Sequence, residues 1–189
     1  MDTKIKKSDW IFWSLIFLTA IAFVAMSFPN TEKVEAALTP QPMESPAPIY
    51  DVPLSAELQQ HINRLCDDYD MDMPLVLAVI GQESNYKAEA VGDGGESIGL
   101  MQIQPRWQQA RMDKLGVTDL MNPLQNVTVG IDLLAELMGE GKGTEWAITA
   151  YNAGEAKADM NKSIGVISEY TESVLMLREE ILNDVQKNM

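Results

Sequence analysis

The run from Leu75 to about Ser84 constrains the fold most, because as a helix it is apolar on almost every side. Its large apolar residues are Leu75, Val76, Leu77, Val79 and Ile80. Pro74 suits the first turn of this helix, where no backbone N–H is needed. A helix without a polar face must be covered all round, so we expect it at the centre of a helical domain. Glu83 would then lie at the end of a buried helix.

The rest of residues 55–189 also predicts helices, which makes the domain all-α. Ser55 is a suitable N-cap for a helix with an apolar stripe at helical spacing: Leu58, Ile62, Leu65, Cys66 and Tyr69. Asn122 and Pro123 begin another, with the stripe Leu124, Val127, Ile131, Leu134 and Met138. We expect two more helices, one capped by Thr144 and running through Tyr151, and a last one from Ile167 to about Val185.

A segment rich in glycine and charge interrupts these helices. Residues 86–97 contain too many glycines and charged side chains for a helix, so we expect a loop, with a short hairpin around Gly92–Gly95.

The N-terminal part predicts a membrane anchor followed by a linker. Residues 10–28 form an uncharged apolar stretch that as a helix spans about 28 Å, close to the thickness of a hydrocarbon core. Lys4, Lys6 and Lys7 precede it, so the positive-inside rule places the rest of the chain outside the cytoplasm. A signal peptide cleaved near Val34–Ala36 is the alternative, which would make the protein secreted. The predicted division is residues 1–29 as cytoplasmic tip and single-pass anchor, 30–54 as a proline-rich linker, and 55–189 as the helical domain.

Charge and composition exclude several classes of function. The formal net charge is −14, which argues against nucleic acid as a partner because phosphates would be repelled. Cys66 is the only cysteine and His61 the only histidine, so an intramolecular disulfide and a histidine-rich metal site are both excluded. We expect no metal and no cofactor.

Glu83 is the strongest catalytic candidate. A carboxyl group at the end of a buried apolar helix loses water, which raises its pKa because the charged form is penalised. A carboxylic acid that stays protonated near neutral pH can donate its proton to the bridging oxygen of a glycosidic bond.

Three short motifs resemble one enzyme family when they are taken in order and at their separations. They are Glu83-Ser84, the segment Gly99–Ile103 (Gly-Leu-Met-Gln-Ile), and the segment Ala150–Gly154 (Ala-Tyr-Asn-Ala-Gly). Over residues 57–177 the chain resembles the lytic transglycosylases of the soluble-transglycosylase (SLT, family 1) type, in the lysozyme-like superfamily. The resemblance implies a lysozyme-like helical fold. It also implies non-hydrolytic cleavage of the bond between N-acetylmuramic acid and N-acetylglucosamine in peptidoglycan glycan strands, with 1,6-anhydro ends.

The resemblance also assigns roles to individual residues. Glu83 would act first as acid and then as base, because the C6 hydroxyl of the muramoyl residue supplies the nucleophile. The implied substrate-binding residues are Ser84, Met101, Gln102, Tyr151, Asn152 and Tyr170. Of these, Met101 would contact a sugar and Gln102 would hydrogen-bond an N-acetyl group. Two neighbours in the second motif, Leu100 and Ile103, are expected in the core. In the third motif, the small residues Ala150, Ala153 and Gly154 would allow tight packing. The match at Tyr170 is weaker, because Val166, Ile167 and Ser168 replace the acidic and threonine residues usual before it.

Two other functions stay open from the sequence. Asp93 or Glu96 in the glycine-rich loop could be a second carboxylate that positions water, which would give a hydrolase similar to goose-type lysozyme. Alternatively, the domain could bind glycan without cutting it and serve as an assembly factor for an envelope-spanning machine whose proteins the sequence does not name.

Overall fold

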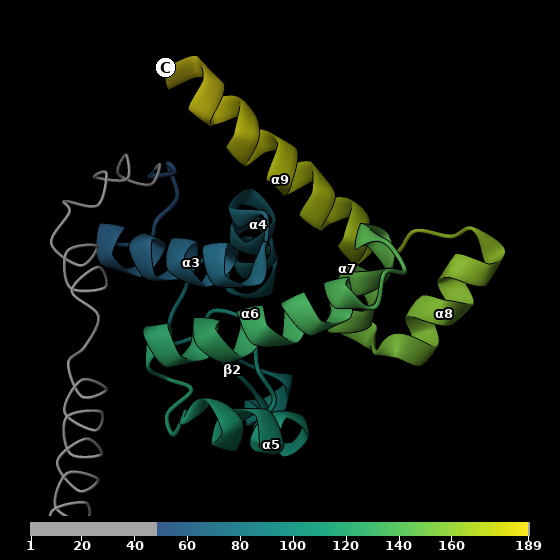
Figure 1. The fold of residues 1–189 in the computed structure, drawn as a ribbon, viewed down its shortest axis with the longest axis horizontal. Helices are drawn as coiled ribbons and strands as arrows, with labels where there is room; N and C mark the ends of the chain where they lie inside the picture. Colours follow the sequence, from purple (N-terminus) through teal and green to yellow (C-terminus); the bar gives the residue numbers. More distant parts are fainter. Residues whose placement is uncertain (1–48, 189) are drawn as a thin grey trace, which may run out of the picture. The chain divides into compact units, whose positions relative to one another are not determined.

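The computed structural model describes residues 49–188, which form a helical unit with one small hairpin (Figure 1). Its elements in chain order are α3 (Ala56–Tyr69), α4 (Met73–Ser84), β1 (Val91–Gly92), a 3-10 turn (Asp93–Gly95), β2 (Ser97–Ile98), α5 (Pro105–Leu115), α6 (Pro123–Gly139), α7 (Thr144–Ala153), α8 (Glu155–Ile164) and α9 (Glu169–Asn188). The predicted all-α class is confirmed for this part of the chain. The predicted anchor at residues 10–28 lies outside the described residues, and no helix within 49–188 is long and apolar enough to span a bilayer.

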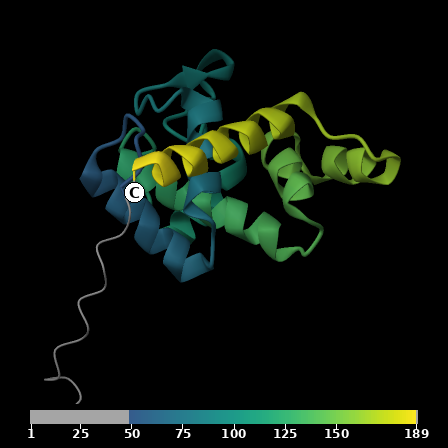
Figure 2. The same ribbon diagram turned by 90° about the horizontal axis from the view of Figure 1, so that it is seen from above.

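Helix α4 is the buried central helix that its composition predicts. All residues from Met73 to Ile80 are buried, and Pro74 lies in the first turn. Helix α9 packs along α4 (Figures 1 and 2). The two helices approach closely at Gly81, where a Cβ atom would lie 2.6 Å from Leu177 Cδ2. A side chain at position 81 would therefore require Leu177 and Tyr86 to move.

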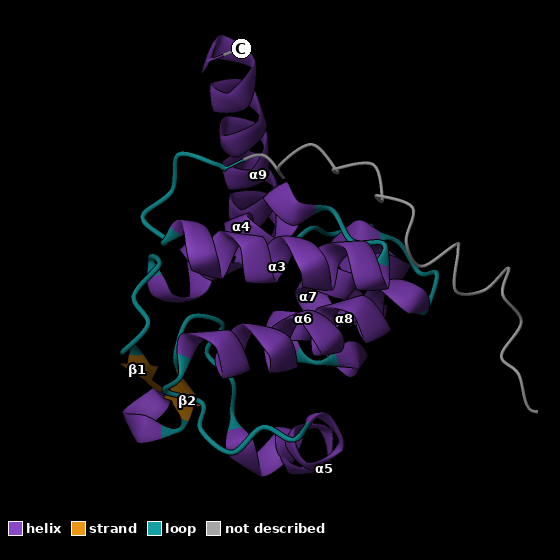
Figure 3. Cartoon of the chain, turned by 60° about the vertical axis from the view of Figure 1, so that its left-hand side comes forward, coloured by secondary structure: helices purple, strands orange, loops and turns teal. Residues whose placement is uncertain are grey.

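Helices α3, α6 and α5 lie in successive layers, with α6 in contact with both of its neighbours (Figure 3). Ser55 Oγ accepts the Leu58 N–H and caps α3, and Asn122 Oδ1 accepts the Leu124 and Gln125 N–H groups and caps α6, as expected. In the predicted α3 stripe, Leu58, Ile62 and Cys66 are buried, while Tyr69 at the helix end is exposed.

The domain begins earlier than the predicted boundary at residue 55. Tyr50, Val52 and Leu54 pack against the core, so they belong to the fold and not to a linker. The buried Gln59 side chain holds them, because its Oε1 accepts the Tyr50 N–H at 2.9 Å and its Nε2 donates to Leu54 O at 3.1 Å. The buried amide satisfies backbone groups that precede the first helix.

Two helix starts differ slightly from the sequence prediction. Gly143 occupies the N-cap of α7 in place of Thr144, which is the first helical residue. Helix α9 begins at Glu169, two residues after the expected Ile167, because Ser168 Oγ accepts the Thr171 N–H at 3.2 Å and acts as the cap.

The glycine-rich segment forms the expected hairpin. Val91 pairs with Ile98 and Gly92 with Ser97, and Ile98 also bridges to Ile103. The hairpin lies near the start of α5 (Figure 3). This short sheet fixes the path of the segment between Ile98 and Ile103.

Candidate active site

A cleft of about 700 Å³ opens between the end of α4, the hairpin, α5, α6 and α7. Most of its lining side chains are polar or acidic, and a continuous stretch from Ala150 to Glu155 runs from the end of α7 to the first residue of α8. The other lining residues are Glu83, Asp93, Ser97, Gln102, Ile103, Gln104, Trp107, Gln108, Leu133 and Leu137.

Glu83 lies in this cleft at the C-terminal end of α4, half-buried. The Tyr170 hydroxyl donates to Glu83 Oε1 at 2.5 Å. Burial raises the pKa of Glu83 because it penalises the charged form, and the negative charge of Asp93 raises it further, while the Tyr170 hydrogen bond opposes the rise. No other described residue bonds the second carboxyl oxygen, Oε2, so that oxygen can carry a proton into the cleft.

Two tyrosines reach the neighbourhood of Glu83 from α7 and α9. Burial raises the pKa of Tyr151 and of Tyr170, and the nearby charge of Glu83 raises both further, so each hydroxyl stays protonated and donates. Tyr151 donates to Met101 O at 2.8 Å, which ties α7 to the segment below the cleft. Tyr170 bonds Glu83 but is not among the residues that line the cleft, so it holds the acid from behind.

Gln102 lines the cleft, whereas Met101 does not. Gln102 Nε2 donates to Gly99 O at 2.9 Å and to Ala90 O at 3.3 Å, and no described residue donates to its Oε1, which packs against Gly92. Met101 is fully buried against Gly130, where a Cβ atom would lie 2.3 Å from Met101 Sδ. The Met101 thioether fills a gap over α6, and the predicted contact between this side chain and a sugar stays a prediction.

Ser84 also points away from the cleft. It is buried, and its Oγ donates to Ile80 O at 3.1 Å within the same helix. Asn152 is exposed and lines the cleft, as a substrate-binding residue should. Of the small residues expected to pack tightly, Ala150 is buried, while Ala153 and Gly154 are exposed at the cleft wall. As expected, Leu100 and Ile103 belong to the core.

The two candidate second carboxylates have different surroundings. Asp93 lines the cleft, and its Oδ2 accepts from Ser97 Oγ at 2.5 Å and from Gln104 Nε2 at 3.0 Å. Glu96 forms an ion pair with Arg106 and does not line the cleft. Asp93 is thus the carboxylate that shares the cleft with Glu83.

Several residues that support the site have no signal in the local sequence pattern. Asn126 is fully buried on α6, where its Oδ1 accepts the Met101 N–H at 2.9 Å and its Nδ2 donates to Ile98 O at 2.8 Å. The asparagine therefore fixes residues 98–101 to α6. The start of α5 and its N-cap contribute Gln104, Trp107 and Gln108 to the lining of the cleft. These residues lie in a polar stretch without helical periodicity, so no pattern in the sequence singles them out.

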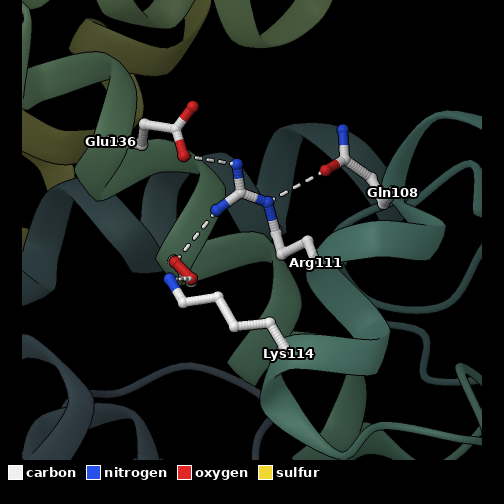
Figure 4. A network of polar contacts seen from close by, with 5 residues as sticks. Gln108, Arg111, Lys114 and Glu136 are labelled. Atoms are coloured by element: carbon white, nitrogen blue, oxygen red, sulfur yellow. Dashed lines mark hydrogen bonds and ion pairs between the residues drawn. The ribbon is translucent and has the colours of Figure 1, made fainter.

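An ion-pair network fastens α5 to α6 (Figure 4). Arg111 Nη1 donates to Asp132 Oδ2 at 2.9 Å, Nη2 donates to Glu136 Oε2 at 2.8 Å, and Nε donates to Gln108 Oε1 at 2.9 Å. The Arg111 and Asp132 side chains are only 12% and 6% exposed, so this pair is shielded from solvent. The network fixes the wall of the cleft that α5 provides.

The profile of the Transglycosylase SLT domain family matches residues 60–166, more than half of the chain. The chain belongs to this family. Among curated relatives, this SLT-domain chain is 34% identical over 103 residues to the invasion protein IagB of Salmonella typhimurium, covering 50% of this chain and 63% of IagB. It is 33% identical over 91 residues to the transglycosylase of Enterobacteria phage PRD1, covering 48% of this chain and 32% of the phage protein. The match thus spans less than two thirds of either relative.

Solved structures agree with the family assignment in their fold. One solved structure is the lytic transglycosylase Slt from Pseudomonas aeruginosa, in the form of an inactive glutamate-to-glutamine mutant. It matches with a TM-score of 0.56 at 20% sequence identity, and the match covers 67% of this chain and 24% of the Slt chain. The 70 kDa soluble lytic transglycosylase SLT70 from Escherichia coli has a TM-score of 0.51 at 22% identity and covers 68% of this chain and 22% of its own. The predicted lysozyme-like fold of the SLT type is confirmed.

Proposed function

We propose that this chain is a peptidoglycan lytic transglycosylase in which Glu83 is the general acid and base. The observation that carries the proposal is the half-buried Glu83 carboxyl in a cleft of about 700 Å³, with a raised pKa and one oxygen bonded to Tyr170. A protonated carboxylic acid at such a place can donate its proton to a glycosidic oxygen. Membership of the SLT-domain family supports the same chemistry.

The reaction needs no second carboxylate on this reading. Glu83 donates its proton to the oxygen between N-acetylmuramic acid and N-acetylglucosamine, and the glycosidic bond breaks as positive charge develops at the muramoyl C1. The C6 hydroxyl of the same muramoyl residue then bonds to C1, and its proton returns to the Glu83 carboxylate. The products are a 1,6-anhydromuramoyl end and a free N-acetylglucosamine hydroxyl, with Glu83 protonated again.

The supporting residues divide into two groups in this proposal. Gln102 and Asn152 line the cleft and hydrogen-bond the glycan, with the Gln102 Oε1 acceptor suited to an N-acetyl N–H. Tyr170 positions Glu83, and Tyr151 holds the segment around Met101. The PRD1 protein and both solved neighbours are transglycosylases, and the Pseudomonas enzyme is inactive as a glutamate-to-glutamine mutant.

A muramidase is the second candidate, and one observation favours it. Asp93 lies in the same cleft as Glu83, and its charge contributes to the raised pKa of Glu83. An ionised carboxylate opposite an acid can position a water molecule for hydrolysis. Glu96 is the poorer choice for this role because it is paired with Arg106 outside the cleft.

Mass spectrometry of the sugars released from purified peptidoglycan tests these alternatives. Anhydromuramoyl ends that disappear in Glu83→Gln and persist in Asp93→Asn support the transglycosylase. Reducing ends that disappear in both variants support the muramidase, and wall binding without products supports an assembly role. Glu57→Gln on α3 makes the same chemical change at an exposed site outside the cleft and should act like the parent chain.

We also propose that residues 10–28 anchor the chain in the cytoplasmic membrane with the catalytic domain outside. The uncharged length of this stretch and the three lysines before it support this orientation. Alkaline phosphatase fused after residue 54 should be active in a bacterial host, because that enzyme folds outside the cytoplasm, and should stay with the membrane fraction. An inactive fusion contradicts the orientation, and release of an active fusion into the medium indicates a cleaved signal peptide.

A further inference from the structure

Trp107 is the most exposed of the large apolar side chains that the structure describes. Its exposed fraction is 71%, and it lines the cleft from the first turn of α5. An indole left in water is unfavourable, since apolar surface gains free energy when it is covered. Its place in a cleft therefore indicates a ligand with an apolar face.

The indole is not a loose surface group. The Arg106 guanidinium lies over the ring, with Cζ 5.2 Å from the ring centroid, and its Nη2 donates to Gln104 Oε1 at 3.2 Å. Arg106 is itself paired with Glu96 on the hairpin. One face of the ring is thus covered by a cation that the hairpin holds in place.

The helix that carries Trp107 is also fixed. Arg111 connects α5 to Asp132 and Glu136 on α6 and bonds Gln108, the residue next to Trp107 (Figure 4). A platform on a braced helix needs little ordering when a ligand binds, which favours affinity.

The chemistry around the indole selects a saccharide. Gln108 also lines the cleft, and no described residue accepts from its Nε2, whereas the neighbouring Gln104 amide already bonds Asp93, Ser97 and Arg106. A pyranose ring has an apolar face of C–H groups and a rim of hydroxyl and N-acetyl groups, so it matches an aromatic face flanked by amides. A nucleotide would also stack, but its phosphates would be repelled by the acidic side chains of Asp93 and Glu155 in the same cleft.

We propose that Trp107 forms a sugar-stacking subsite of the cleft, in which the indole covers the C–H face of one N-acetylhexosamine ring of the glycan strand. The Gln108 Nε2 donates to a hydroxyl or N-acetyl oxygen at the rim of that ring. This subsite rests on the proposed function, because it assigns one binding position for the same glycan. It makes Trp107 a substrate-binding residue that contributes to affinity and not to proton transfer.

The test is a titration of the full chain with chitohexaose, the β-1,4-linked hexamer of N-acetylglucosamine, in a Glu83→Gln background that prevents turnover. We expect Trp107→Ala to raise the Kd about tenfold, which corresponds to a loss of about 1.4 kcal/mol of binding free energy. Trp107→Phe keeps an aromatic face and should recover most of the affinity. Met176→Ala on α9 is the matched control, because Met176 is 66% exposed and lies outside the cleft.

Cleavage kinetics on peptidoglycan give the second readout. Trp107→Ala should raise KM and leave kcat nearly unchanged, while circular dichroism shows an intact fold. A Kd for Trp107→Ala within about twofold of the parent overturns the subsite, as does a parent chain that does not bind chitohexaose. Binding that depends on Trp107 in a chain that cuts no glycan supports the subsite and contradicts only the transglycosylase activity.

Discussion

Arg111→Ala should destabilise the protein more than any exposed charge substitution on α5. The change removes the partner of Asp132, whose side chain is only 6% exposed. Asp132 Oδ2 then loses its hydrogen bond from Arg111 Nη1, and Oδ1 already has no hydrogen-bond partner. The variant therefore leaves a buried carboxylate that retains only the longer ion pair with the exposed Lys114 among the described residues.

The expected cost follows from that burial. Removing one member of a buried ion pair costs about 3 to 5 kcal/mol, because the remaining charge stays desolvated. Lys114 Nζ lies 3.6 Å from Asp132 Oδ1 and is 72% exposed, so it can move toward the carboxylate and keep the loss near the lower end. A loss of about 3 kcal/mol is a large share of the roughly 5 to 15 kcal/mol typical of a folded domain and lowers Tm by about 10 °C.

Urea unfolding followed by circular dichroism measures this loss. Lys114→Ala is the matched control, because it removes an exposed cation from the same carboxylate and should cost less than about 1 kcal/mol. The double variant Arg111→Met with Asp132→Leu removes both charges and should recover most of the stability. If Arg111→Ala costs no more than Lys114→Ala, the shielded pair does not hold α5 in place and the reasoning is wrong.

Three further predictions concern the site and the core. The folded-state pKa of Glu83 is raised, so the free energy of unfolding falls as pH rises from the ordinary glutamate pKa to the raised one. Glu83→Gln should therefore be more stable than the parent at neutral pH. Equal stability of the two chains at every pH contradicts this. Tyr170→Phe removes the hydrogen bond that opposes the rise in the Glu83 pKa, so the alkaline limb of the activity profile should move to higher pH; an unchanged limb contradicts this. Gly130→Ala places a Cβ atom 2.3 Å from Met101 Sδ and should lower the free energy of unfolding by about 1 to 3 kcal/mol, as measured by chemical denaturation. An unchanged denaturation midpoint would show that the Met101 side chain moves aside freely.

The sequence predicted those helices whose apolar pattern or cap is local. The apolar α4, the Ser55 cap of α3 and the Asn122 cap of α6 all depend on residues within a few positions of one another. Helices α5 and α8 were not predicted, because each buries very few side chains: Met112 on α5, and Ala158 and Asn161 on α8. Stripes that small do not stand out from a polar stretch.

The candidate site shows the same division between local and distant information. The place of Glu83 at the end of a buried helix follows from the local apolar run. The bond from Tyr170, the support of residues 98–101 by Asn126, and the pairing of Arg111 with Asp132 join residues distant in sequence, and no local pattern encodes them. Met101 was expected to contact a sugar, but its burial depends on the gap above Gly130 on another helix.

The hydrogen bond to Glu83 sets a limit on how this chain can be shortened. Tyr170 follows Glu83 by 87 residues and lies beyond residue 166, where the family match ends. A recombinant chain cut at that residue would keep the cleft-lining residues and every part of the match, yet it would lose α9, the hydroxyl bonded to Glu83 and the cover over α4. The folded unit that includes the Tyr170–Glu83 hydrogen bond is therefore longer than the family profile, and a nascent chain cannot form that bond until its last helix has docked.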